Sequence, residues 1–192
     1  TYYNNGLQKM HRDFGAGFYL QGHFPFNTHY ELEVITKTEN SKNIRIFKTP
    51  YGDLTEITQF SNASYSTPIV EYLIKGIDDL KKLRYVYENT YYTKNYDLAE
   101  HEYETIGSNG VVLCYMPKSP MMELVALLSG IETFTYMFAD DEEELSHTLS
   151  VMEEKCDQAC EIVLNSPAEC IMIPENISSE SVGKTFYHMY ME

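Results

Sequence analysis

The chain has few basic residues. It contains 14 lysines and arginines against 29 aspartates and glutamates, so its formal net charge at pH 7 is −15. A protein that binds nucleic acid or an anionic lipid surface needs a basic stripe that neutralises phosphate charge, and the sequence shows none. We therefore expect neither nucleic acid nor a membrane among its partners.

Long apolar runs are also missing. No segment approaches the roughly 20 apolar residues that a membrane-spanning helix needs, and no signal peptide with a basic start and an apolar middle is visible. The four cysteines lie in apolar surroundings in the second half of the chain, unlike a secreted disulfide framework. These features predict a cytoplasmic protein.

Motifs for phosphate and metal binding are absent from the sequence. It has neither GxGxxG nor GxxxxGK[ST], the glycine-rich loops that hold phosphates, and neither HxH nor HExxH, which are typical of zinc sites. Cys156 and Cys160 lie four residues apart on one helical face, but no nearby histidine completes a ligand set. We predict no metal site in this chain and interpret both thiols as structural.

Residues 29–60 alternate between apolar and polar side chains. With 192 residues and 43% apolar content, the chain is long enough to form a core, and we predict a single domain over 1–192. The alternation, broken by polar turns at 38–43 and 50–53, predicts an antiparallel hairpin with a third strand after it. Such a small sheet is often an addition to a larger domain.

After Pro68 the pattern becomes helical and is interrupted by two short apolar runs, at 111–115 and 170–173. Their length and composition are typical of buried strands. Helical segments separate the two runs, and this order predicts parallel strands with crossover helices. Residues 68–192 are therefore predicted to be β/α units of a barrel or of an open α/β sheet.

Ligands of parallel α/β folds bind at the loops that follow the strands. Glu175 and Asn176 follow the second apolar run, and a carboxylate there could act as acid or base, orient a substrate or bind a metal. A local capping role for Glu175 is the alternative. The predicted catalytic residues are Glu175 and Asn176, and the predicted substrate-binding residues are Tyr115, Met116, Lys118, Met121 and His23.

Five segments, in this order and spacing, resemble the uroporphyrinogen decarboxylase superfamily from about residue 29 to the end. They are 48–56 (KTPYGDLTE), 68–83 (PIVEYLIKGIDDLKKL), 119–122 (SPMM), 138–152 (FADDEEELSHTLSVM) and 168–191 (AECIMIPENISSESVGKTFYHMYM). The resemblance implies a (β/α)8 TIM barrel, of which this chain would be an incomplete middle portion with an added antiparallel hairpin. It matches Glu175 to a glutamate of the decarboxylases, and Asn176 to the position of their serine.

The function that this resemblance implies is a methyltransferase that moves a methyl group to or from a corrinoid or a thiol. The alternatives are a uroporphyrinogen decarboxylase of tetrapyrrole biosynthesis, and a non-catalytic binding domain with a tyrosine-rich surface. No cofactor is expected in these residues, because the zinc ligands of the methyltransferases would lie beyond Glu192. The expected partners are a small-molecule substrate, a corrinoid protein and a second copy of the chain.

Overall fold

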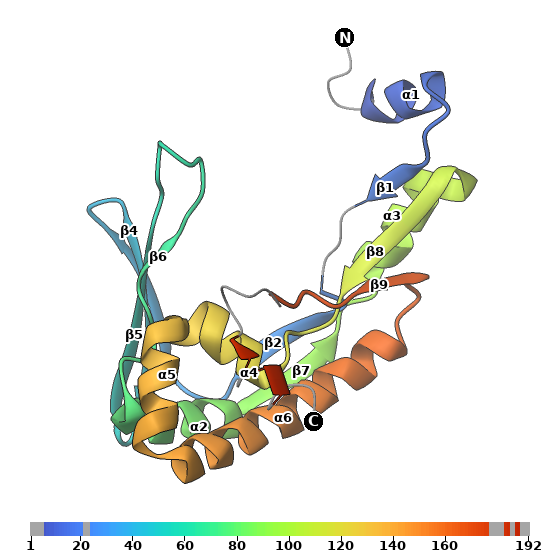
Figure 1. The fold of residues 1–192 in the computed structure, drawn as a ribbon. Coiled ribbons are helices and arrows are strands. Elements are labelled where there is room, and N and C mark those ends of the chain that lie inside the picture. The colour runs from blue at the N-terminus through green and yellow to red at the C-terminus, as the bar shows by residue number, and fades with distance from the viewer. Residues whose placement is uncertain (1–5, 21–23, 177–182, 185–186, 189–192) are drawn as a thin grey trace. The chain divides into compact units, whose positions relative to one another are not determined.

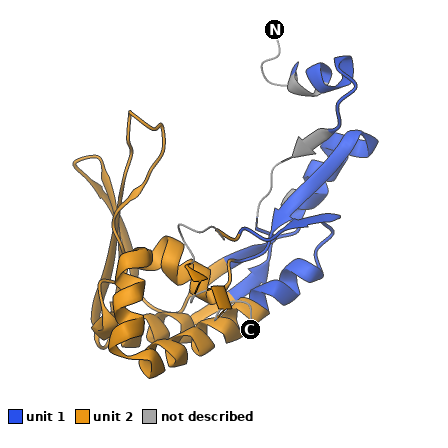
Figure 2. Cartoon of the chain, viewed as in Figure 1, with its two compact units in different colours: residues 1–27, 92–117, 158–174 blue, residues 28–91, 118–157, 175–192 orange. Residues whose placement is uncertain are grey.

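The computed structural model describes residues 6–20, 24–176, 183–184 and 187–188 (Figure 1). The chain forms two compact units, each built from three separate stretches (Figure 2). The first unit contains residues 1–27, 92–117 and 158–174, and the second contains residues 28–91, 118–157 and 175–192. Each unit is described below by itself.

The second unit contains an antiparallel sheet with the strand order β3-β4-β5-β6. The two residues between β3 and β4, Asn40 and Ser41, both have positive φ, as a tight hairpin turn requires. The register places Arg45 opposite Glu56 and Phe47 opposite Leu54. The strands are β3 (Val34–Glu39), β4 (Lys42–Thr49), β5 (Gly52–Gln59) and β6 (Ile69–Glu71).

Helices of the second unit supply most of its core. They are η1 (Ile77–Asp79), α2 (Leu80–Glu88), α4 (Pro120–Glu123), the π-helical segment η3 (Leu124–Leu128), α5 (Gly130–Asp140) and the first part of α6 (Glu142–Leu164). Their apolar side chains form one buried cluster with Phe47 and Leu54 of the sheet. Its largest fully buried members include Phe134, Leu80 and Leu124.

The first unit contains a parallel sheet with the strand order β1-β8-β9. Its strands are β1 (Phe18–Leu20), β8 (Gly110–Tyr115) and β9 (Cys170–Met172). Helix α3 (Asp97–Ile106) leads through η2 (Gly107–Asn109) into β8, and Ile106 and Val112 form a small buried cluster with Tyr103. Helix α1 (Gly6–Asp13) precedes β1. A separate two-stranded sheet pairs β2 (Phe26–Tyr30) with β7 (Thr90–Lys94), and the division into units falls within both of these strands.

The predicted TIM barrel is wrong. In the described part of the chain the parallel sheet has three strands, and the larger sheet is antiparallel. The physical reason lies in the segment between β8 and β9, because its helices place Met121, Leu124 and Phe134 in the core of the antiparallel sheet. A barrel needs those apolar faces to cover its own parallel strands.

Two smaller predictions about the fold are confirmed. Residues 29–60 contain the antiparallel strands β3, β4 and β5, and β8 and β9 are adjacent parallel strands, with Tyr115 opposite Met172. Among the described helices, none has both the length and the apolar composition to cross a bilayer. The cytoplasmic location stays a prediction.

Candidate functional site

The structure brings Glu175 onto the first residues of α4. The backbone N–H of Ser119 donates to Glu175 Oε1 at 2.7 Å, and the Ser119 hydroxyl donates to Oε2 at 3.1 Å. Ser119 also caps the helix, because its Oγ accepts from the backbone N–H of Met122 at 3.4 Å. Glu175 therefore contacts the N-terminus of α4 across a sequence separation of 56 residues, which differs from the local capping given as the alternative. The acid–base role of Glu175 stays a prediction.

Lys118 and Asn176 form a second contact between the same two loops. The Lys118 Nζ donates to Asn176 Oδ1 at 2.7 Å. The Lys118 carbonyl accepts from the Cys156 thiol at 3.5 Å. Met121, also a predicted substrate-binding residue, is 7% exposed and belongs to the core. The loops that follow β8 and β9 thus meet through Lys118 and Ser119, as the prediction from parallel strands requires.

Tyr115 and Met116 belong to the first unit. The Tyr115 ring packs against Phe24, with ring centroids 5.7 Å apart, and the backbone N–H of Met116 donates to the Met172 carbonyl at 2.9 Å. His23 lies outside the described residues. The structure therefore groups Lys118, Met121, Glu175 and Asn176 in one unit and assigns Tyr115 and Met116 to the other.

A polar cluster around Glu123 was not anticipated from the sequence. Glu123 is the last residue of α4 and directly precedes the π-helical segment η3. Short π-helical segments occur often at functional sites. Electrostatic interactions and hydrogen bonds connect the side chains of this Glu123 cluster. Its members are Tyr30, Arg45, Glu56, Tyr87, Lys118 and Glu123.

Arg45 and Glu56 form the part of the cluster that the sheet supplies. They are cross-strand neighbours, and Arg45 Nη2 lies 3.1 Å from Glu56 Oε1 and 3.2 Å from Oε2. The Glu56 side chain is 13% exposed and that of Arg45 is 39% exposed. The Arg45 guanidinium also lies over the Phe47 ring, 5.1 Å from its centroid. These contacts hold a positive charge at the edge of an apolar core.

Glu123 is half-buried and has positive neighbours. Burial raises the pKa of its carboxyl above the ordinary value of 4.5, because the charged form loses hydration. A hydrogen bond from the Tyr87 hydroxyl lowers the pKa, and the charges of Lys118 and Arg45 lower it further, but burial outweighs them. The neutral acid therefore persists to a higher pH than in a solvated glutamate.

Tyr30 titrates in the same surroundings. Although 37% of the residue is exposed, desolvation raises the pKa of its hydroxyl, and the positive charge of Arg45 opposes this effect. The charges of Glu123 and Glu56 raise the pKa further. Tyr30 thus stays protonated at neutral pH and can donate a hydrogen bond within the cluster.

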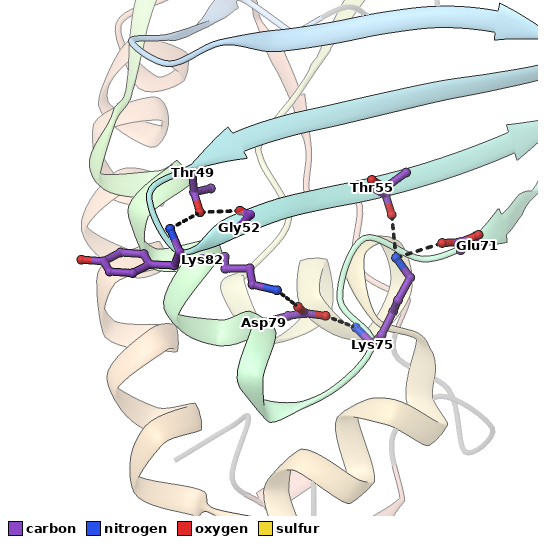
Figure 3. Close-up of polar contacts among 8 residues, drawn as sticks. Thr49, Gly52, Thr55, Glu71, Lys75, Asp79 and Lys82 are labelled. Atoms are coloured by element: carbon purple, nitrogen blue, oxygen red, sulfur yellow. Dashed lines mark hydrogen bonds and ion pairs between the residues drawn. The ribbon is translucent and has the colours of Figure 1, made fainter.

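A second polar network connects η1 and the start of α2 to strand β5 and is structural (Figure 3). Asp79 accepts from the Lys75 backbone N–H at 2.9 Å and pairs with Lys82 at 2.7 Å. The Lys75 ammonium in turn reaches the Thr55 carbonyl at 3.0 Å and Glu71 at 2.9 Å. Each charge in this network has a partner of opposite sign or a carbonyl, so the network fixes η1 against the sheet.

Metal binding has no candidate among the described residues. In that part of the chain no three histidine, cysteine, aspartate or glutamate side chains lie close enough to hold an ion. The zinc expected beyond Glu192 therefore stays a prediction, as do the corrinoid protein and the second copy of the chain.

No family model, curated protein or solved structure matches the chain. The resemblance to the uroporphyrinogen decarboxylase superfamily therefore stays a prediction, and the barrel that it implied is contradicted.

Proposed function

We propose that the second unit carries an acid–base site in which Glu123 exchanges a proton with a bound small molecule. The observation that supports this most is the raised pKa of a carboxyl that still has a hydroxyl and two cations around it. A general acid works best when its pKa is close to the ambient pH, and burial is the usual way of raising a glutamate toward it.

The neighbours of Glu123 have separate roles in this proposal. Tyr87 donates to the carboxylate once the proton has left, and Lys118 offsets the charge that remains. Glu175 is a positioning residue, because it acts through Ser119 on the first turn of the helix that ends at Glu123. The capped helix α4 thus fixes the backbone position of Glu123.

Proton transfer also bears on the alternatives that the resemblance implied. In a decarboxylation the carbon that loses carbon dioxide keeps the electron pair of the broken bond and takes up a proton. A Glu123 acid would supply that proton and become a carboxylate. The decarboxylase alternative is therefore the one that this site would serve, while methyl transfer and the non-catalytic role stay predictions without an assigned residue.

The titration of Glu123 tests the proposal directly. Carbon-13 NMR of the side-chain carboxyls would follow the resonance that Glu123→Gln removes, and we expect its midpoint to lie above 4.5. Tyr87→Phe should raise the midpoint further, since the hydroxyl stabilises the charged form. Tyr85→Phe, on the same helix and against the Tyr51 ring, is the matched control and should leave the midpoint unchanged.

Stability should depend on pH with a definite sign. A carboxyl whose pKa is raised by folding binds more protons in the native state, so stability falls as pH rises from the unfolded pKa through the folded one. Glu123→Gln cannot ionise, and it should therefore gain stability relative to the wild type over that range in urea unfolding. A midpoint at or below 4.5, or parallel pH profiles for the two proteins, would refute the proposal.

A further inference from the structure

Arg45 is the residue of the Glu123 cluster with an unmet hydrogen-bonding capacity. Among the described residues, its Nε is a buried side-chain nitrogen without a hydrogen-bond partner. Its Nη2 is occupied by Glu56, and its planar face lies against Phe47. Leaving a buried donor unpaired carries a penalty that native structures seldom retain without a reason.

Building on the proposed acid–base site, we infer that Arg45 binds an oxyanion group, a carboxylate or a phosphate, of the molecule on which Glu123 acts. A guanidinium presents its N–H groups in a planar fork that matches the oxygens of such a group. The Arg45 side chain is 39% exposed, so part of it is accessible from solvent although its Nε is buried. Turning the guanidinium toward that anion also gives the unpaired Nε–H an acceptor.

The charges around Arg45 favour an anion. Arg45 and Glu56 carry opposite charges, and Lys118 adds a positive charge to the cluster while Glu123 is in its neutral form. Lys118 donates to Asn176, and the carboxylate of Glu175 accepts from the N–H and hydroxyl of Ser119. In a chain with a formal net charge of −15, attraction of an anion has to come from such a local group of cations.

The position of Arg45 links the anion to the reacting proton. The charges of Arg45 and Glu123 interact, and both also act on the Tyr30 hydroxyl. An anion held on Arg45 therefore lies in the same cluster as the acid, with the Phe47 and Tyr30 rings, whose centroids are 5.2 Å apart, as its apolar neighbours. The substrate class that fits is a small molecule with one oxyanion beside its reacting atom.

Binding of simple anions to the full 192-residue chain tests this inference. The probes are sodium acetate and inorganic phosphate, each titrated at constant ionic strength against chloride, with nuclear magnetic resonance of the arginine side chains as readout. We expect saturable binding of at least one probe, with a shift of the Arg45 Nε signal. Binding of acetate alone would assign a carboxylate, and binding of phosphate alone would assign a phosphate.

Three variants give the expected pattern. Arg45→Gln should weaken the bound probe about tenfold or more, since a charge-assisted pair is lost. Arg45→Lys keeps the charge but not the fork and should weaken it less. Arg84→Gln is the matched control, because Arg84 is also largely buried and paired, with Glu144 at 2.7 Å, yet lies outside the cluster; it should bind the probe as the wild type does.

The outcomes separate this inference from the proposed function. Absence of saturable binding to the wild type, or equal binding by Arg45→Gln, would overturn the role of Arg45. The Glu123 titration is measured without added anion, so a raised midpoint together with unchanged binding by Arg45→Gln would leave the acid–base site standing. If Arg45→Gln does not fold, the shift of the wild-type Nε signal and the affinity of Arg45→Lys decide.

Discussion

The two units of this protein use their apolar residues differently. In the second unit the antiparallel sheet and its helices share one continuous buried cluster, which includes Leu80, Phe134 and Leu145. In the first unit the buried cluster consists of Ile106 and Val112 with Tyr103 packed on it. Some apolar strand residues there are open to solvent, with Val111 40% and Met172 41% exposed, whereas Leu113 and Cys114 are buried.

This contrast shows where a polar site can be built. An unpaired or titrating side chain is costly, and a large core can compensate for that cost while a small one cannot. The Glu123 cluster, with its largely buried Glu56 and its unpaired Arg45 Nε, lies in the unit with the large core. We therefore expect the second unit both to carry the functional site and to contribute most of the unfolding free energy.

The largest expected effect comes from core truncation in each unit. Phe134→Ala removes a ring that is 0% exposed and should cost about 3–5 kcal/mol of unfolding free energy. Val112→Ala removes two methyl groups from the small cluster and should cost about 1–2 kcal/mol. Urea unfolding of the two variants gives the free energies, and native-state hydrogen exchange should show weaker protection in β8 than in β4. Equal free-energy losses in the two variants, together with uniform protection, would refute the claim that the second unit has the more stabilising core.

Much of the second unit could be predicted because its signals are local. Alternation along 29–60 and two short turns are sufficient for an antiparallel sheet, since each strand pairs with its neighbour in sequence. The Ser119-Pro120 helix start was also predictable, and Ser119 does cap α4. The barrel was not, because its closure depends on which sheet the helices between β8 and β9 cover, and a helical pattern does not specify that.

The site was predictable only in part for the same reason. Parallel pairing of β8 and β9 predicted that Lys118 and Glu175 would come from neighbouring loops, and their contacts do connect those loops. The Glu123 cluster combines residues from three strands, two helices and a loop, without a shared motif. One signal was available: a tight turn at Pro50 and Tyr51 places Arg45 opposite Glu56.

A smaller loss of unfolding free energy is expected when the contacts of Glu175 and Asn176 with the loop before α4 are removed. Glu175→Gln keeps the shape of the side chain but loses the negative charge that accepts from the N–H and hydroxyl of Ser119. We expect a loss of about 1–2 kcal/mol in unfolding free energy. Asn176→Ala removes the more exposed bond from Lys118 and should cost less than about 0.5 kcal/mol.

Urea unfolding of both variants at pH 7 provides the measurement. The Glu123 carboxyl resonance should also shift in Glu175→Gln, because the first turn of α4 loses its anchor. If Asn176→Ala were the more damaging change, the anchor would be the Lys118 bond, and Glu175 would be free to act on substrate as the sequence predicted.

The smallest expected changes in unfolding free energy come from removing one ion pair in each unit. Asp79 pairs with Lys82 at 2.7 Å, with side chains 15% and 21% exposed, and also accepts from the Lys75 N–H. Asp13 pairs with Lys9 at 2.6 Å, but these side chains are 43% and 65% exposed. Although the distances are nearly equal, solvent screens the second pair far more.

We therefore expect Asp79→Ala to cost about 1 kcal/mol, mostly through the lost bond from the Lys75 backbone N–H. Asp13→Ala should change stability by less than about 0.5 kcal/mol. Repeating the urea titrations in 1 M salt sharpens the contrast. The Asp79 effect should persist, because hydrogen bonds to a partly buried carboxylate are screened weakly, whereas any Asp13 effect should vanish. If the Asp79 effect were salt-sensitive, the network in Figure 3 would stabilise the protein mainly through solvent-screened charge interactions, and not through hydrogen bonds that fix η1 against the sheet.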